Sequence, residues 1–149
     1  MSTPADIVLP NGAATLRFFW VEDRYQHEFR VGDKCVRSIT RSDIETPVYT
    51  DLHQQGDLLF ASGNAGIGHW SAAIEPNGDG FLFDVAIRLG HAAESIASAY
   101  AGTGAANSIA ITPVDGSAQL TTTDSQVMIL PVAEIMAPVC TVCYKYAVG

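Results

Sequence analysis

The chain has 149 residues, a length typical of one domain that buries about two thirds of the surface exposed by its unfolded form. Hydrophobic residues make up 48% of the chain and charged residues 16%, which predicts a packed core and argues against global disorder. The formal net charge of −8 argues against nucleic acid and anionic membrane surfaces as partners, although six of the eight Lys and Arg residues fall within residues 17–41.

The first residues carry no basic stretch followed by an apolar run, so they do not resemble a secretory signal. No apolar stretch approaches the roughly 20 residues that a membrane-spanning helix needs. Three cysteines without an export signal, Cys35, Cys140 and Cys143, indicate reduced thiols. We therefore expect a soluble cytoplasmic protein in which residues 1–149 form a single β domain.

Residues 15–31 contain two alternating runs on either side of Glu22-Asp23. A tight turn at this pair predicts a hairpin in which three aromatic or apolar pairs lie on one face. These pairs are Trp20 with Tyr25, Phe18 with His27, and Leu16 with Phe29. On the other face the same register sets Arg17 against Glu28, Phe19 against Gln26 and Val21 against Arg24.

A second hairpin is predicted around the turn-forming run Pro76-Asn77-Gly78-Asp79. Centring the turn on Asn77-Gly78 pairs Ile74 with Phe81, Ala72 with Phe83 and Trp70 with Val85. One face of this hairpin is then continuously apolar. Two long hairpins of this kind are expected to close over a shared core.

Further β-branched runs predict strands at 35–40, 57–62, 108–112, 118–122, 126–132 and 139–148. Residues 91–106 fit a short helix and a strand equally well. The predicted fold class is therefore all-β: an antiparallel barrel or two-sheet sandwich of about 8–11 strands, with at most one short helix.

The mixed face of the second hairpin carries weak candidates for catalysis. Its predicted register places Ser71 opposite Asp84, with His69 diagonal to Asp84. Asp84 interrupts an apolar run, and a carboxylate buried there would have to be paired, hydrogen-bonded or neutral. Strands do not preorganise a relay of this kind, and the surrounding sequence is not a nucleophile elbow.

Nothing in the sequence predicts a metal site or a cofactor. The alternation of residues 139–148 sends Cys140 and Cys143 to opposite faces of a strand, whereas a shared metal ion needs both sulfurs on one side. The glycine runs at 63–68 and 102–104 do not open helices, as phosphate-binding loops do.

The aromatic faces of the two hairpins predict either a packed core or the lining of a small apolar cavity. In the second case the ligand-binding residues are Phe18, Trp20, Tyr25, His27, Trp70 and Phe83. Antiparallel hairpins with aromatic inner faces resemble calycin-type barrels. The Gly-x-Trp that opens the first strand of lipocalins occurs here only in mid-chain, as Gly68-His69-Trp70, so no family is assigned.

Three functions remain open from the sequence. The first is a non-enzymatic binding domain for a small apolar or amphipathic ligand inside a calycin-like β-barrel. The second is an assembly protein that forms a homo-oligomer through apolar sheet faces such as that of Phe19 and Val21. The third is a small barrel enzyme that uses Asp84 and His69 as acid and base.

Overall fold

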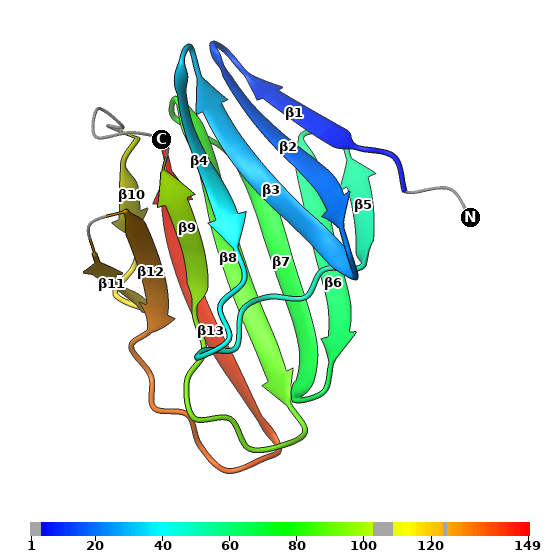
Figure 1. The fold of residues 1–149 in the computed structure, drawn as a ribbon, viewed down its shortest axis with the longest axis vertical. Helices are drawn as coiled ribbons and strands as arrows, with labels where there is room; N and C mark the ends of the chain where they lie inside the picture. Colours follow the sequence, from blue (N-terminus) through cyan, green and yellow to red (C-terminus); the bar gives the residue numbers. More distant parts are fainter. Residues whose placement is uncertain (1–3, 103–108, 124) are drawn as a thin grey trace.

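The computed structural model describes residues 4–102, 109–123 and 125–149, which form 13 strands and no helix (Figure 1). Neighbouring strands pair antiparallel throughout. No segment within these ranges forms a helix that is long and apolar enough to cross a membrane.

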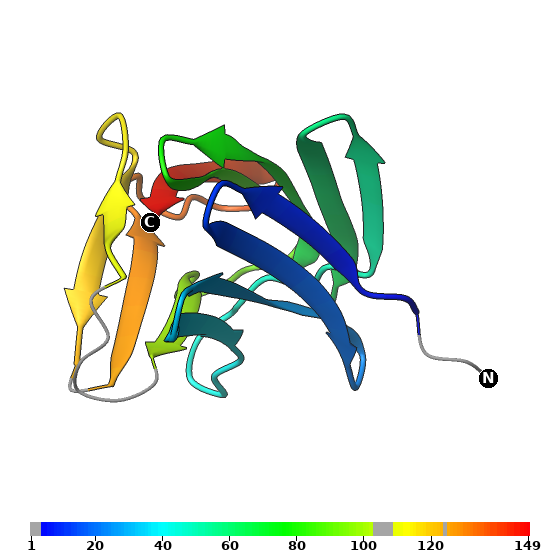
Figure 2. The ribbon, with the colours of Figure 1, turned by 90° about the horizontal axis from the view of Figure 1, so that it is seen from above.

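The strands form two sheets that face each other and do not close into a barrel (Figure 2). The first sheet has the order β1 (Ile7–Asn11), β2 (Ala14–Val21), β3 (Arg24–Val31), β4 (Lys34–Ile39), β9 (Ser98–Gly102), β12 (Gln126–Pro131) and β11 (Ala118–Thr122). The second has the order β10 (Ile111–Pro113), β13 (Cys140–Val148), β8 (Gly80–Leu89), β7 (Gly68–Asn77), β6 (Leu58–Ala65) and β5 (Asp51–Gln55).

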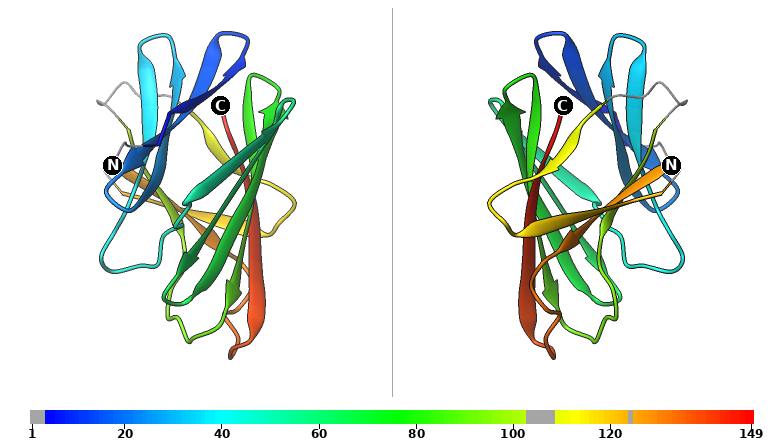
Figure 3. Two further views of the ribbon diagram at one scale, coloured as in Figure 1. Left: turned by 90° about the vertical axis from the view of Figure 1, so that its right-hand side faces the viewer. Right: turned by 90° about the vertical axis from the view of Figure 1, so that its left-hand side faces the viewer.

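This architecture confirms the predicted all-β, antiparallel fold class. Along β7, β8 and β13 buried residues alternate with more exposed ones, because successive side chains of a strand point to opposite faces of a sheet. The inner faces of the two layers, seen edge-on in Figure 3, share one hydrophobic core.

The register of the first hairpin is confirmed. Trp20 lies opposite Tyr25, Phe18 opposite His27 and Leu16 opposite Phe29, across the turn at Glu22-Asp23. Opposite charges also meet on the outer face as predicted, where Arg17 lies opposite Glu28.

The predicted register of the second hairpin is wrong by two residues. Asn77 pairs with Gly80, so the turn consists of Gly78 and Asp79, and Gly78 takes the positive φ of 57° that glycine adopts readily. Trp70 therefore lies opposite Ile87, not Val85. A shift of two residues keeps every side chain on its predicted face, whereas a shift of one would have reversed them.

Three strands without a clear sequence signal complete the sheets: β1, β5 and β9. The segment at 91–106 supplies β9, so within its described part the strand alternative is confirmed; residues 103–106 lie outside the described residues. Strand β10 overlaps the predicted strand at 108–112 only at its last two residues, since it begins at Ile111, and Ser108 also lies outside the described residues.

The chain crosses between the sheets at residues 45–50. The Tyr25 backbone N–H, at the start of β3, donates to the Tyr49 carbonyl at 2.7 Å. The next residue, Thr50, donates its N–H to the Ser62 carbonyl in β6 at 2.8 Å. One short segment is thus hydrogen-bonded to both layers.

Candidate functional site

The six residues predicted to contact a ligand lie in or against the packed core. Phe18, Trp70 and Phe83 have no exposed surface, Tyr25 and His27 are buried, and Trp20 packs against the core from its edge. The imidazole ring of His27 stacks between Phe18 and Phe83, with centroid distances of 4.8 and 5.1 Å. The indole N–H of the buried Trp70 has no hydrogen-bond partner among the described residues.

A buried polar chain accompanies these aromatic rings. His27 Nε2 shares a hydrogen bond of 2.6 Å with the Tyr100 hydroxyl, which shares another of 2.6 Å with the Tyr146 hydroxyl. Tyr144 and Ser98 share a third, of 2.7 Å. Burial lowers the pKa of His27 to about 3 and raises the pKa of Tyr146 to about 12, so both groups are neutral near neutral pH.

The space beside this chain is small. Tyr25, His27, Tyr49, Ser98 and Tyr100 are among the residues that border a cavity of about 10 Å³. This volume is close to the smallest that holds one water molecule. A ligand larger than water has no room in this cavity.

The three residues predicted as catalytic candidates are not brought together. Because of the two-residue shift, Ser71 lies opposite Ala86 instead of Asp84. Asp84 is exposed, and its carboxylate lies 3.8 Å from the Lys145 ammonium on β13. A carboxylate in this position is solvated, so the burial that would make it an acid or base is missing.

His69 has a different partner. Its Nδ1 lies 2.8 Å from the Asn64 side-chain oxygen, and it stands directly across the strands from Arg88. Within the described ranges no three His, Cys, Asp or Glu side chains gather closely enough to hold a metal ion.

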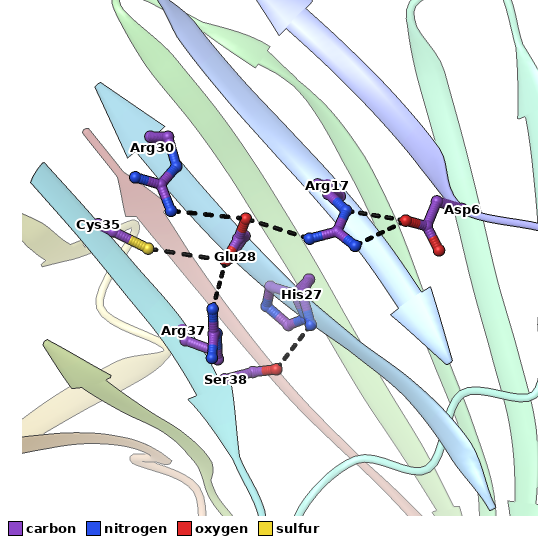
Figure 4. A network of polar contacts seen from close by, with 8 residues as sticks. All are labelled: Asp6, Arg17, His27, Glu28, Arg30, Cys35, Arg37 and Ser38. Carbon is purple, nitrogen blue, oxygen red and sulfur yellow. Dashed lines mark hydrogen bonds and ion pairs between the residues drawn. The ribbon is translucent and has the colours of Figure 1, made fainter. Parts of the chain in front are cut away.

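The densest polar cluster lies on the outer face of β2, β3 and β4, centred on Glu28 (Figure 4). Register explains it, since Glu28 faces Arg17 on β2 and Arg37 on β4, and Arg30 follows two residues along β3 on the same face. Glu28 is bound by Arg37 at 2.8 Å and approached by Arg17 at 3.5 Å and Arg30 at 3.9 Å. Arg17 also binds Asp6 at 2.7 Å.

The carboxylate is buried and the guanidinium groups are not. The Glu28 side chain is 8% exposed, against 42% for Arg17, 48% for Arg30 and 54% for Arg37. Burial opposes ionisation of Glu28, but the hydrogen bond and charge of Arg37, with the charges of the other two arginines, outweigh it and keep its pKa below the usual value. Burial and the nearby Glu28 charge raise the pKa of the Cys35 thiol, which therefore stays protonated.

Phe19 extends the cluster towards an open groove. Two of these guanidinium groups lie over its ring, with the Arg17 Cζ 4.9 Å and the Arg37 Cζ 5.6 Å from the ring centroid. The groove beside it encloses about 490 Å³. Its lining combines apolar side chains with polar and charged ones: Phe19, Val21, Ile39, Gln26, Ser38, Thr40, Arg24, Arg37, Glu22 and Asp23.

Hydrogen bonds hold the polar side chains of the groove in place. The Ser38 hydroxyl donates to the Gln26 amide oxygen at 2.7 Å, and the Gln26 amide nitrogen donates to the Thr40 hydroxyl at 2.8 Å. The backbone N–H of His27 donates to Ser38 at 2.8 Å, which ties this chain to the core beneath (Figure 4).

Sequence reasoning found one contact of the cluster, Arg17 with Glu28, and missed the rest. The register of β4 against β3 was not predicted, so Arg37 was not placed beside Glu28. The sequence does contain one signal for the cluster around Glu28, which is the concentration of basic residues at 17–41 in an acidic chain.

Comparison with known protein families, curated proteins and solved structures found no significant match to this chain.

Proposed function

We propose that this protein is a non-enzymatic binding module for an amphipathic anion, and that the ligand binds on the outer face of β2, β3 and β4. The anionic group would contact Arg37, Arg30 and Arg17, and the apolar body would lie in the groove along Phe19. The observation that carries the proposal is the convergence of three half-exposed arginines on one buried carboxylate beside an aromatic ring.

The charge balance supports an anion. In the cluster around Glu28, three guanidinium groups face two carboxylates, those of Glu28 and Asp6, which leaves one positive charge in excess there. The negative side chains Glu22 and Asp23 line the groove instead, and Arg24 pairs with Asp23. Each guanidinium has five N–H donors. Arg30 reaches Glu28 only at 3.9 Å, beyond hydrogen-bonding distance, and Arg37 binds it through a single nitrogen, so both retain donors for a ligand.

The preorganisation of the arginines also supports the binding of an anion. Binding an anion with mobile side chains costs conformational entropy, and Glu28 already restrains the arginines before a ligand arrives. Arg37 supplies the hydrogen bond that the buried Glu28 carboxylate needs, whereas Arg17 and Arg30 lie further from it and are about half exposed, so their ion pairs with Glu28 add little to folding.

Fluorescence titration with anilinonaphthalene sulfonate tests this proposal, because this probe joins an aromatic body to a fixed negative charge. Phenylnaphthylamine, which has the same body without the sulfonate, is the matched neutral probe. We expect the sulfonate to bind more tightly than the neutral probe. R37Q should weaken its binding about tenfold through loss of a charge-assisted hydrogen bond, and F19A about tenfold through loss of apolar contact.

K145Q removes one positive charge from the other sheet and should leave the affinity unchanged. Thermal melting of each variant checks that the fold is intact, since this probe also stains partly unfolded protein. Equal binding of the two probes, or full retention of binding by both R37Q and F19A, would overturn the proposal.

Assembly through the same face is the second candidate function. Val21 is 39% exposed beside Phe19, and apolar surface of this kind is typical of contacts between subunits. Native mass spectrometry separates the two functions. A homo-oligomer that F19A converts to monomers would favour assembly, whereas a monomer that binds the sulfonate probe favours ligand binding.

A further inference from the structure

A second open cleft lies on the opposite sheet, where the turn between β6 and β7 faces the end of β8. It encloses about 430 Å³. Its polar lining side chains are Asn64, His69, Arg88 and His91, and Val139 forms part of its apolar border. No Asp or Glu is among its described lining residues, although the chain carries 16 of them.

Arg88 is the distinctive group in this cleft. Within the described part of the chain its guanidinium group takes part in no hydrogen bond or ion pair. The remaining arginines all have carboxylate partners: Arg17, Arg24, Arg30, Arg37 and Arg41. The residues directly across from Arg88 are His69 on β7 and Thr141 on β13, neither of which supplies a negative charge.

One histidine is held by its side chain and the other by its backbone. The Asn64 amide oxygen can only accept, so the His69 Nδ1 carries the proton of their 2.8 Å bond, and the His69 Nε2 donates to an anion when the ring is doubly protonated. The backbone N–H groups of Gly90 and His91 both donate to the Ile67 carbonyl, at 2.8 and 3.1 Å. These bonds hold the end of β8 against the turn that carries the cleft.

We propose that this cleft binds a tetrahedral dianion, a sulfate or phosphate group, on Arg88 with His69 and His91. An arginine without a carboxylate partner keeps all five donors for such a group. A metal ion is the less suitable occupant, because the Arg88 guanidinium repels cations. The site is independent of the groove at Phe19, which lies on the other sheet.

The charged and titratable groups that face an anion in this cleft are Arg88, His69 and His91, and none of the described lining residues is a carboxylate that would repel it. Sulfate is the suitable probe, because it is a dianion throughout the neutral pH range.

Titration of sulfate into the full chain labelled with nitrogen-15 tests the proposal. Amide shifts are expected at Gly66, Gly68 and Gly90. R88Q should weaken sulfate binding about tenfold or more, and the joint replacement H69Q with H91Q should weaken it as well. K145Q again serves as the control.

Phenyl phosphate and inorganic phosphate, compared at pH 8.0 where both are mainly dianions, identify the form of the ligand: tighter binding of the ester indicates a phosphomonoester, and equal binding indicates the free anion. Shifts confined to β2, β3 and β4, or a dissociation constant that R88Q leaves unchanged, would overturn the site. Because R37Q tests only the groove at Phe19, failure of either proposal is recognised separately.

Discussion

His27 shows how one buried residue makes the stability of this protein depend on pH. Burial between two phenyl rings lowers its pKa to about 3, whereas the unfolded chain protonates histidine below about pH 6.5. The unfolded state therefore binds the extra proton between these values. Stability is complete above about pH 6.5 and falls with pH below it, by up to about 1.4 kcal/mol per pH unit.

Urea unfolding of the His27→Phe variant checks this prediction. The free energy of unfolding of wild type should fall more steeply from pH 6.5 to 4.5 than that of the variant, which has no imidazole to protonate. At pH 7.5 the variant should lose about 1 kcal/mol with its bond to Tyr100. His53→Gln, an exposed histidine, should keep the wild-type slope, and parallel curves for wild type and H27F would contradict the assignment.

At this scale the sequence predicted the neighbour of His27 along the hairpin but not its polar partner. Alternation across a tight turn places Phe18 opposite His27, because both lie in one local hairpin. Tyr100 is 73 residues away, and its approach depends on β9 entering the first sheet beside β4. No local pattern encodes that neighbour.

Strand β6 illustrates how an element depends on a glycine. A β-carbon at Gly63 would overlap the carbonyl oxygen of Val48 in the segment that crosses between the sheets. That segment is hydrogen-bonded to β6 through Thr50 and to β3 through Tyr49, so it has little freedom to retreat. We expect Gly63→Ala to lower the free energy of unfolding by about 1–3 kcal/mol, as overpacking does.

Gly66→Ala is the matched control, because a β-carbon at Gly66 would meet no atom within 4 Å and its backbone needs no positive φ. It should change stability by no more than about 0.5 kcal/mol in the same urea measurement. Equal effects of the two substitutions would show that the crossing segment does not rest on Gly63.

Elements with regular alternation could be predicted from the sequence, and those without it could not. The inner face of β8 alternates Phe81, Phe83 and Val85 with less buried residues, and its facing direction was predicted even though its register was off by two. Strand β5 consists of Asp-Leu-His-Gln-Gln and is largely exposed, so no apolar period marks it. Its strand form comes from pairing with β6.

At the scale of the whole molecule, the candidate groove cannot be predicted from the pairing within single hairpins. The sequence predicts the pairing of Glu28 with Arg17, because the two residues share a hairpin. Arg37 joins them only through the pairing of β3 with β4. The order of strands in each sheet likewise sets which outer face each basic residue occupies. The sequence therefore predicts the class of fold, and the structure supplies the surfaces on which the functional proposals depend.

The two sheets are also joined at the end where the β1–β2 and β7–β8 turns meet, and Asn11 makes this junction. Its side-chain amide donates to the carbonyls of Gly78 at 3.0 Å and Gly80 at 2.8 Å, which belong to the other sheet's hairpin. Asn11→Asp keeps the shape, removes both donors and sets a carboxylate against two carbonyl oxygens. We expect a loss of about 1–3 kcal/mol in urea unfolding.

Gln54→Glu makes the same amide-to-carboxylate change at an exposed position of β5, where the side chain reaches a single nearby carbonyl at 3.4 Å, and it should cost little. If the sheets unfold as one unit, tryptophan fluorescence and far-ultraviolet circular dichroism of N11D will report the same shifted midpoint. Trp20 lies on the first sheet and Trp70 on the second, so separate unfolding of the layers would split the fluorescence transition. An N11D midpoint equal to that of Q54E would mean that the packed core holds the sheets together without Asn11, and a split transition would mean that the two sheets do not unfold as one unit.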